Sequence, residues 1–298
     1  MIETHELSHT YQPGSPFEAV AVHNISLRIE DGDFAAFVGA TGSGKTTLIQ
    51  HFNGLLKPTS GWVKVDGLDL NASPDEKRTD KKAAKLRLRE LRRTVGMVFQ
   101  YPEHQLFEET VAKDVAFGPK NLGLSEVECE TRVREAMDRV GLPYETYSAR
   151  SPFELSGGQM RRAAVAGVLA MRPRTLILDE PTAGLDPSGR RDLLELLMGL
   201  NRDGVTIALV SHTMEDVARL ARRVFVLRKG TLARTGTPAE LFADAAGLRA
   251  LGLEIPQMAR LRELLLAEGI QIPRDVLTPE AMADVLERLI KEHLGVSA

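Results

Sequence analysis

The sequence predicts an α/β fold in which apolar strands alternate with helices around a mainly parallel sheet. Three observations support this prediction. First, four short apolar runs are typical of buried parallel strands, at residues 34–38, 94–99, 175–179 and 205–210. Second, a glycine-rich loop and a helix-forming segment follow the first run. Third, polar or acidic residues follow the other three runs, at the strand ends where open α/β sheets bind ligands.

The loop after the first strand is the strongest single signal in the chain. Residues 39–46 read GATGSGKT and fit the phosphate-binding pattern G-x-x-x-x-G-K-[ST]. The glycines allow several backbone N–H groups to point at one anion at the start of a helix. We expect Lys45 to reach the β- and γ-phosphates of a nucleotide and the Thr46 hydroxyl to bind Mg²⁺. The predicted nucleotide-binding residues are Gly39, Ala40, Thr41, Gly42, Ser43, Gly44, Lys45, Thr46 and Thr47.

The strand at residues 175–179 ends in two carboxylates, Asp179 and Glu180. We expect Asp179 to hold Mg²⁺, directly or through water, and Glu180 to polarise the attacking water as a general base. A strand that simply ends in charged residues is common. Together with the phosphate-binding loop, that alternative is the weaker explanation.

A motif between these two elements resembles the signature of ATP-binding-cassette (ABC) ATPases. Residues 155–159 read LSGGQ, and a helix-forming run follows them. The resemblance implies a P-loop NTPase with a RecA-like core, an antiparallel β subdomain and a helical subdomain. It also implies that the signature faces the γ-phosphate of a nucleotide held by the opposite subunit, through a helix N-terminus. The residues of this motif that match are Ser156, Gly157, Gly158 and Gln159.

Four further positions match landmarks of the ABC family. Gln100 resembles the glutamine that senses Mg²⁺ and the attacking water, and His212 resembles the switch histidine that contacts the γ-phosphate. Asp186 ends an AGLD segment similar to the D-loop, which crosses the dimer interface. Tyr11 lies where the family places an aromatic ring that stacks on adenine, with Phe17 as the alternative. The resemblance thus implies ATP and Mg²⁺ as cofactors, Glu180, His212 and Gln100 as catalytic residues, and Thr46, Gln100 and Asp179 at the metal.

Composition fits an ATPase that has no membrane span of its own. The chain has 298 residues, a net charge of −3 and one cysteine, Cys129, which suits a reducing cytoplasm. The small net charge gives no general attraction to nucleic acid or anionic membranes. We find no signal-peptide pattern at the N-terminus and no run of about 18 apolar residues. A role at a membrane is therefore expected to depend on partners.

The patterning predicts two domains. Residues 1–239 are expected to form the ATP-binding domain, with period-two strands before the loop and a helical subdomain at about 100–171. Residues 240–298 are expected to form a helical C-terminal domain that contacts a second subunit. A helix pair packed on its own core is the alternative, because the shared face of Met258, Leu261, Leu264 and Leu265 fits both. For the basic run from Lys77 to Arg93 we favour a solvated helix and linker over a patch for lipid headgroups or nucleic acid.

A narrower resemblance is to the ATPase subunits of energy-coupling factor (ECF) transporters, in particular the second of their two paralogues. It rests on FQYPEHQLF at residues 99–107, DVAFGPKNLG at 114–123, TYQPGSPF at 10–17 and GLEIPQ at 252–257. The resemblance implies a peripheral protein at the cytoplasmic face of the cell membrane, part of a vitamin or transition-metal importer. The implied partners are a second ECF ATPase, a transmembrane coupling protein and a substrate-binding membrane protein, and no nucleic acid. In that family residues 99–107 and 114–123 line the groove that receives coupling helices of the membrane subunit. The apolar cluster of Leu106, Phe107, Val111, Val115 and Phe117 lies at the position of the family's helical subdomain.

Two rival functions come from other classes. A soluble ABC protein that acts on ribosomes or DNA commonly has two cassettes or a long coiled-coil insertion, whereas this chain has one P-loop and no heptad run. A regulatory cassette without hydrolysis is disfavoured by Glu180 and His212.

Overall fold

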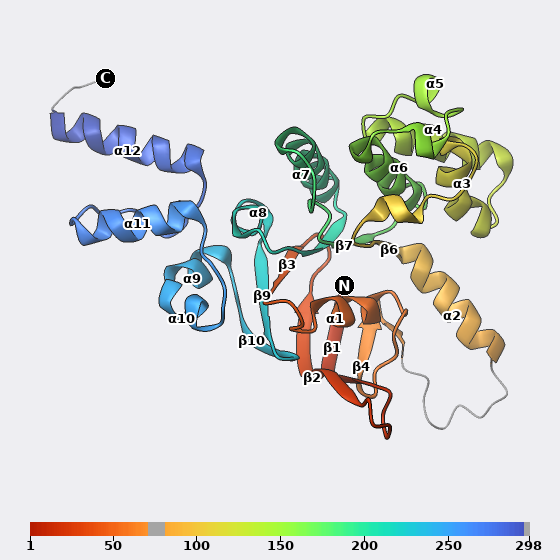
Figure 1. Cartoon of the computed structure of the whole chain (residues 1–298), viewed down its shortest axis with the longest axis horizontal. Helices are drawn as coiled ribbons and strands as arrows, with labels where there is room; N and C mark the ends of the chain where they lie inside the picture. Colours follow the sequence, from red (N-terminus) through yellow and green to blue (C-terminus); the bar gives the residue numbers. More distant parts are fainter. Residues whose placement is uncertain (71–80, 295–298) are drawn as a thin grey trace.

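The centre of the molecule is a six-stranded sheet in the order β10-β9-β3-β8-β7-β6 (Figure 1). The computed structural model describes residues 1–70 and 81–294. Five strands run parallel and only β10, at the edge, is antiparallel to its neighbour. Every residue of β3, β7 and β8 is buried, as a sheet covered on both faces requires. The predicted α/β class is therefore confirmed. The strands are β3 (Phe34–Val38), β6 (Val95–Val98), β7 (Thr175–Asp179), β8 (Thr206–Val210), β9 (Arg223–Arg228) and β10 (Thr231–Gly236).

A second, antiparallel sheet has the order β2-β1-β4-β5. Its buried side chains share one core with the central sheet and with helix α1, where Phe37 and Phe52 pack with their ring centroids 5.9 Å apart. This core fixes the helix that follows the glycine-rich loop against both sheets. The elements are β1 (Ile2–Tyr11), β2 (Ala19–Ile29), α1 (Lys45–Phe52), β4 (Ser60–Val65) and β5 (Leu68–Asp69).

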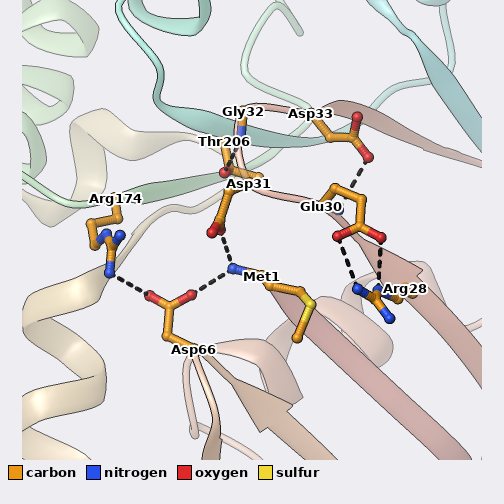
Figure 2. A network of polar contacts seen from close by, with 9 residues as sticks. All are labelled: Met1, Arg28, Glu30, Asp31, Gly32, Asp33, Asp66, Arg174 and Thr206. Atoms are coloured by element: carbon orange, nitrogen blue, oxygen red, sulfur yellow. Dashed lines mark hydrogen bonds and ion pairs between the residues drawn. The ribbon is translucent and has the colours of Figure 1, made fainter.

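Polar contacts join the two sheets at the turn between β2 and β3 (Figure 2). The backbone N–H of Gly32 donates to the Thr206 hydroxyl at the start of β8, over 2.9 Å. Asp66, in the β4–β5 turn, pairs with Arg174, which lies just before β7, over 3.6 Å. Asp31 and Asp66 also flank the amino group of Met1. These contacts hold the antiparallel sheet against the beginnings of the central strands, opposite the ends that carry the predicted site.

Helices α3 to α6 form a separate layer beyond the edge strand β6 (Figure 1). They share one core with the central sheet, and it includes Leu106, Val111 and Val115. Phe107 and Phe117, by contrast, are 57% and 46% exposed and contact each other edge to face. The predicted apolar cluster is thus split between a core and a surface. The helices are α3 (Val111–Asn121), α4 (Glu126–Arg139), α5 (Tyr144–Tyr147) and α6 (Gly157–Leu169).

The C-terminal helices lie at the opposite end of the molecule from α3–α6 (Figure 1). Side chains of α9 and α10, among them Leu241 and Leu248, pack against Val224 and Val226 of β9. Helices α11 and α12 share a small core of their own with Met258, Leu261 and Leu265. Leu264 is 61% exposed, so the expectation that it shares their face is wrong; the helical turn points it outward. The C-terminal helices are α9 (Pro238–Ala243), α10 (Ala245–Ala250), α11 (Gln257–Ala267) and α12 (Pro279–Leu294). Helices α7 (Pro187–Arg202) and α8 (Met214–Leu220) precede them and pack against the central sheet.

Part of the basic run, residues 77–80, lies outside the described residues, and helix α2 (Lys81–Thr94) contains the rest. Leu91 is buried, while Leu86, Arg92 and Arg93 are exposed. This is the pattern of a helix that buries one edge and solvates its charges. No helix in the described part of the chain is long and apolar enough to cross a membrane.

A buried histidine on α1 makes stability depend on pH. His51 is fully buried; its Nδ1 lies 2.7 Å from the Thr47 carbonyl oxygen and its Nε2 lies 3.3 Å from Nδ1 of His9. Burial lowers the pKa of His51 from 6.5 to about 4. Between these values the unfolded chain binds a proton that the folded chain does not, so stability falls as the pH falls below 6.5. The total loss by pH 4 is about 3 kcal/mol from this group.

We therefore expect the free energy of unfolding, measured with urea, to decrease between pH 7 and pH 5 more steeply in the natural chain than in His51→Gln. The comparison of slopes isolates His51 from the carboxylates, which titrate in both proteins. Equal slopes would show that His51 does not contribute.

Candidate nucleotide-binding site

The loop between β3 and α1 has a backbone that only glycine accommodates at two positions. Gly44 has a φ of +97°, and a Cβ there would lie 2.5 Å from the Ala21 carbonyl oxygen. A Cβ at Gly39 would lie 2.4 Å from the Leu227 carbonyl oxygen. The loop is therefore held tightly between neighbouring strands, and it leads into the N-terminus of α1, where a helix favours an anion.

Two buried polar side chains of this loop, Lys45 and Ser43, are suited to a phosphate. Lys45 is almost fully buried, and its Nζ donates to the carbonyl oxygens of Gly39 and Ala40 over 2.8 and 3.2 Å. Burial lowers the pKa of Lys45, while the charges of Glu180 and Asp179 act in the opposite direction. The Ser43 hydroxyl is buried and has no hydrogen-bond partner among the described residues. A buried ammonium and a hydroxyl without a partner at the start of a helix fit the oxygens of a phosphate.

The Thr46 hydroxyl and the carboxylate of Asp179 lie together at the carboxyl end of β7. The hydroxyl donates to Oδ2 of Asp179 over 2.8 Å. Burial raises the pKa of Asp179, and the hydrogen bond from Thr46 lowers it. Within residues 1–70 and 81–294, no group of three or more His, Cys, Asp or Glu side chains would hold a metal ion alone. One hydroxyl and one carboxylate fit Mg²⁺ that takes its remaining ligands from phosphates and water.

Glu180 is the centre of a cluster formed by three loops. His212, after β8, places its Nε2 2.6 Å from Oε1 of Glu180. Gln100, after β6, donates from Nε2 to Oε2 of Glu180 over 3.3 Å. Glu180 itself has a φ of +49°, a conformation that non-glycine residues adopt most often where function requires it. The three predicted catalytic residues therefore lie together, next to Asp179 and Lys45.

The signature residues lie elsewhere, at the start of α6 in the helical layer (Figure 1). Ser156 caps this helix by accepting from the backbone N–H of Gln159, whose side chain donates to the Tyr147 hydroxyl over 3.2 Å. Ser156 and Gly157 are exposed. Asp186 is also exposed and caps α7 by accepting from the backbone N–H of Gly189. The predicted site is thus in two parts, and the part with the signature faces solvent.

Tyr11, the predicted adenine-stacking residue, lies beside the start of α1. Its hydroxyl is 3.2 Å from the Thr47 hydroxyl, and its ring packs edge to face on His9 with centroids 4.7 Å apart. The ring is still 40% exposed and can receive a base. Phe17 is 79% exposed in the following loop. The contacts of Tyr11 favour it over Phe17.

Sequence reasoning missed Arg161, a buried side chain that bonds to Glu103, Pro181 and Ala183. A charged residue within the buried face of a helix that is otherwise rich in alanine and valine was the available signal. That the Ser43 hydroxyl is buried without a hydrogen-bond partner could not be predicted either, because a sequence motif does not show the burial of a single atom.

A phosphate-binding loop, a buried aspartate with a glutamate beside it, and a separate exposed signature together define an ABC-type ATPase cassette. A family model described as "ABC transporter" matches residues 22–183. The chain is 49% identical to the energy-coupling factor transporter ATP-binding protein EcfA2 of Clostridium perfringens, over 98% of this chain and 99% of the relative. It is 55% identical to EcfA2 of Symbiobacterium thermophilum, over 94% of this chain and 93% of the relative. The chain therefore belongs to the ATP-binding proteins of energy-coupling factor transporters, within the ABC transporter family.

Solved structures agree with this assignment. CbiO1 from Clostridium perfringens, described as part of the ABC transporter complex cbiONQ, aligns with a TM-score of 0.71 and 37% identity, over 88% of this chain and 98% of CbiO1. The cassette MJ0796, solved as a dimer, aligns with a TM-score of 0.69 and 29% identity, over 80% of this chain and 99% of MJ0796.

Proposed function

We propose that this chain hydrolyses ATP at an interface with a second ECF ATPase and so powers a membrane importer. The observation that carries this proposal is Glu180, held by Gln100 and His212 beside the Asp179–Thr46 pair. Mg²⁺ would neutralise phosphate charge at Thr46 and Asp179. Glu180 orients and deprotonates a water, His212 donates toward the γ-phosphate, and Gln100 positions the water from the opposite side.

The division of the site supports a requirement for two subunits. Ser156 and Gly157 are exposed at a helix N-terminus, where their groups can face an anion. They do not form part of the cluster around Lys45 and Glu180. The binding site for a nucleotide at Lys45 is therefore completed by the signature of another subunit. ATP holds the two subunits together until hydrolysis releases them.

A groove between α2, β6, α3 and α6 supports docking to a membrane protein. Its lining includes the exposed rings of Phe107 and Phe117 and the carboxylate of Asp114. Asp114 accepts from the backbone N–H groups of Phe107 and Glu108, which fixes the segment that presents Phe107. This segment follows Gln100 by a few residues, so motion at the ATP site reaches the groove directly.

We propose as partners a second ECF ATPase in a heterodimer, a transmembrane coupling protein and a substrate-binding membrane protein, with no nucleic acid. The chain would act peripherally at the cytoplasmic face of the cell membrane in uptake of a vitamin or a transition-metal ion. In this proposal residues 1–239 form the ATP-binding domain, with its helical subdomain at about 100–171, and residues 240–298 supply a dimer contact. Exposed Leu264 and Ile290 on α11 and α12 support that contact.

The proposal is tested by reconstituting the chain with its copurifying membrane subunits in liposomes. We expect ATP-dependent uptake with the natural chain and none with Lys45→Ala, because the variant loses the ammonium that binds the phosphates. Equilibrium titration of Lys45→Ala should show lost nucleotide affinity with an unchanged melting temperature. The matched control is Lys113→Ala, because Lys113 is an exposed lysine on α3 whose Nζ pairs with Glu109. Normal uptake with Lys45→Ala would contradict the proposal.

Base stacking gives a second test. Tyr11→Ala is expected to weaken ATP affinity by about 1–2 kcal/mol, the scale of a base–aromatic stack. Tyr11→Phe keeps the ring, so its ATP affinity should be nearly unchanged. Isothermal titration of ATP into the three proteins measures the difference. If Phe17→Ala gives the loss and Tyr11→Ala does not, Phe17 is the stacking residue.

A further inference from the structure

Arg161 is a buried arginine that the hydrolysis mechanism above does not use. It lies in the second turn of α6, close to the signature, and is 5% exposed. Burial of a guanidinium is costly unless its donors are satisfied. All three of its nitrogens are hydrogen-bonded, and the partners come from two other segments of the chain.

The first segment is the turn that leads from the catalytic glutamate into the D-loop. Nη1 of Arg161 donates to the carbonyl oxygen of Pro181 over 3.0 Å and to that of Ala183 over 2.6 Å. The backbone N–H of Ala183 in turn donates to the carbonyl oxygen of Glu180 over 3.1 Å. Nη1 of Arg161 therefore bonds to two carbonyl groups, one just before the D-loop and one at its first residue.

The second segment is the short 3₁₀ turn Pro102–Gln105, between Gln100 and the docking groove. Nε and Nη2 of Arg161 both donate to the carboxylate of Glu103, at 3.3 Å. The carboxylate compensates the buried charge and leaves Nη1 directed at the D-loop. Arg161 thus joins the signature helix to the D-loop on one side and to the groove on the other.

We propose that Arg161 is a positioning residue for the nucleotide site of the partner subunit. The proposal rests on the proposed function, in which the signature and the D-loop are the two elements that this chain contributes across the interface. Arg161 fixes these elements relative to each other, so they meet the partner's nucleotide as one rigid unit.

The test compares Arg161→Lys with the unmodified chain, both in the Glu180→Gln background, which slows hydrolysis. Lysine keeps the charge beside Glu103 but cannot span two carbonyl groups and a carboxylate. We expect the melting temperature and the ATP affinity of the lone chain to stay unchanged. MgATP-dependent association with the copurified second ATPase, measured by analytical ultracentrifugation, should weaken about 10- to 100-fold, the scale for a lost charge-assisted hydrogen bond.

Two further variants sharpen the result. Arg172→Lys makes the same substitution just beyond α6, at an exposed arginine that pairs with Glu135, and should associate normally. Glu103→Gln leaves both carbonyl contacts of Arg161 in place. Its MgATP-dependent association should also stay close to that of the unmodified chain. An equal loss in Glu103→Gln and Arg161→Lys would assign the effect to the ion pair and overturn the proposal.

The remaining outcomes separate this inference from the function on which it rests. Unchanged association of Arg161→Lys overturns the inference alone. A melting temperature and a lone-chain ATP affinity that fall together with association show a general structural role and also overturn it. If the unmodified Glu180→Gln chain does not associate in MgATP, the proposed function itself fails.

Discussion

Replacing Glu180 with glutamine is expected to slow ATP turnover about 100- to 10,000-fold, the range for loss of a general base. ATP binding should persist, because Lys45, Thr46 and Asp179 remain in place. The amide keeps one of the two oxygens that Gln100 and His212 contact, and it cannot take a proton from water. The ATP-bound dimer should therefore accumulate. Steady-state phosphate release and size-exclusion chromatography in MgATP measure the two effects.

The matched control is Glu195→Gln, the same substitution on the exposed face of α7. It should turn over ATP at the natural rate. An unchanged rate in Glu180→Gln would show that another group activates the water, and the assignment of Glu180 would be wrong.

Replacing Phe107 with aspartate is expected to abolish association with the membrane subunit, and hence uptake. The ring is 57% exposed in the isolated chain, where it contacts Phe117 edge to face. Burial of such a ring against a partner contributes about 2–4 kcal/mol, as interface aromatics do. Because the ring lies outside the core, the isolated protein should keep its melting temperature and its ATP affinity. Copurification with the membrane subunit and uptake in liposomes are the measurements.

Val127→Asp is the control, since Val127 is 76% exposed on α4 and does not line the groove. It should leave copurification intact. A lower melting temperature of Phe107→Asp would place the ring in the core of the helical layer. If Phe107→Asp has an unchanged melting temperature and supports normal uptake, the docking groove lies elsewhere.

Most of the central sheet could be predicted because its inner strands are largely apolar. Residues 34–38 are all apolar, the runs 175–179 and 206–210 are polar only at Thr175, Asp179 and Thr206, and all three strands are buried. Such runs are typical of strands in a sheet that is covered on both faces. The site at their carboxyl ends followed from the motifs, and the structure brings Gln100, Glu180 and His212 into contact.

Features that depend on which way single apolar side chains point could not be predicted. Leu106 and Phe107 are adjacent and both apolar, yet one is buried and the other exposed. Leu264 has helical spacing with Leu261 and Leu265, which are partly buried, but it points to solvent. Apolar periodicity predicts an apolar face, but it does not indicate whether the surface that covers this face belongs to the same chain. The contacts of Arg161 were hidden for a related reason, because they join segments about 20 and 60 residues apart.

The central claim is that this chain works as one of two ATPases in a membrane importer. Mass spectrometry of the intact complex, extracted from native membranes in mild detergent, tests it most directly. The account predicts one copy of this chain with one copy of a second ATPase, bound to a transmembrane coupling protein and a substrate-binding membrane protein. Recovery of this chain alone, or in a complex without any membrane protein, would contradict the account.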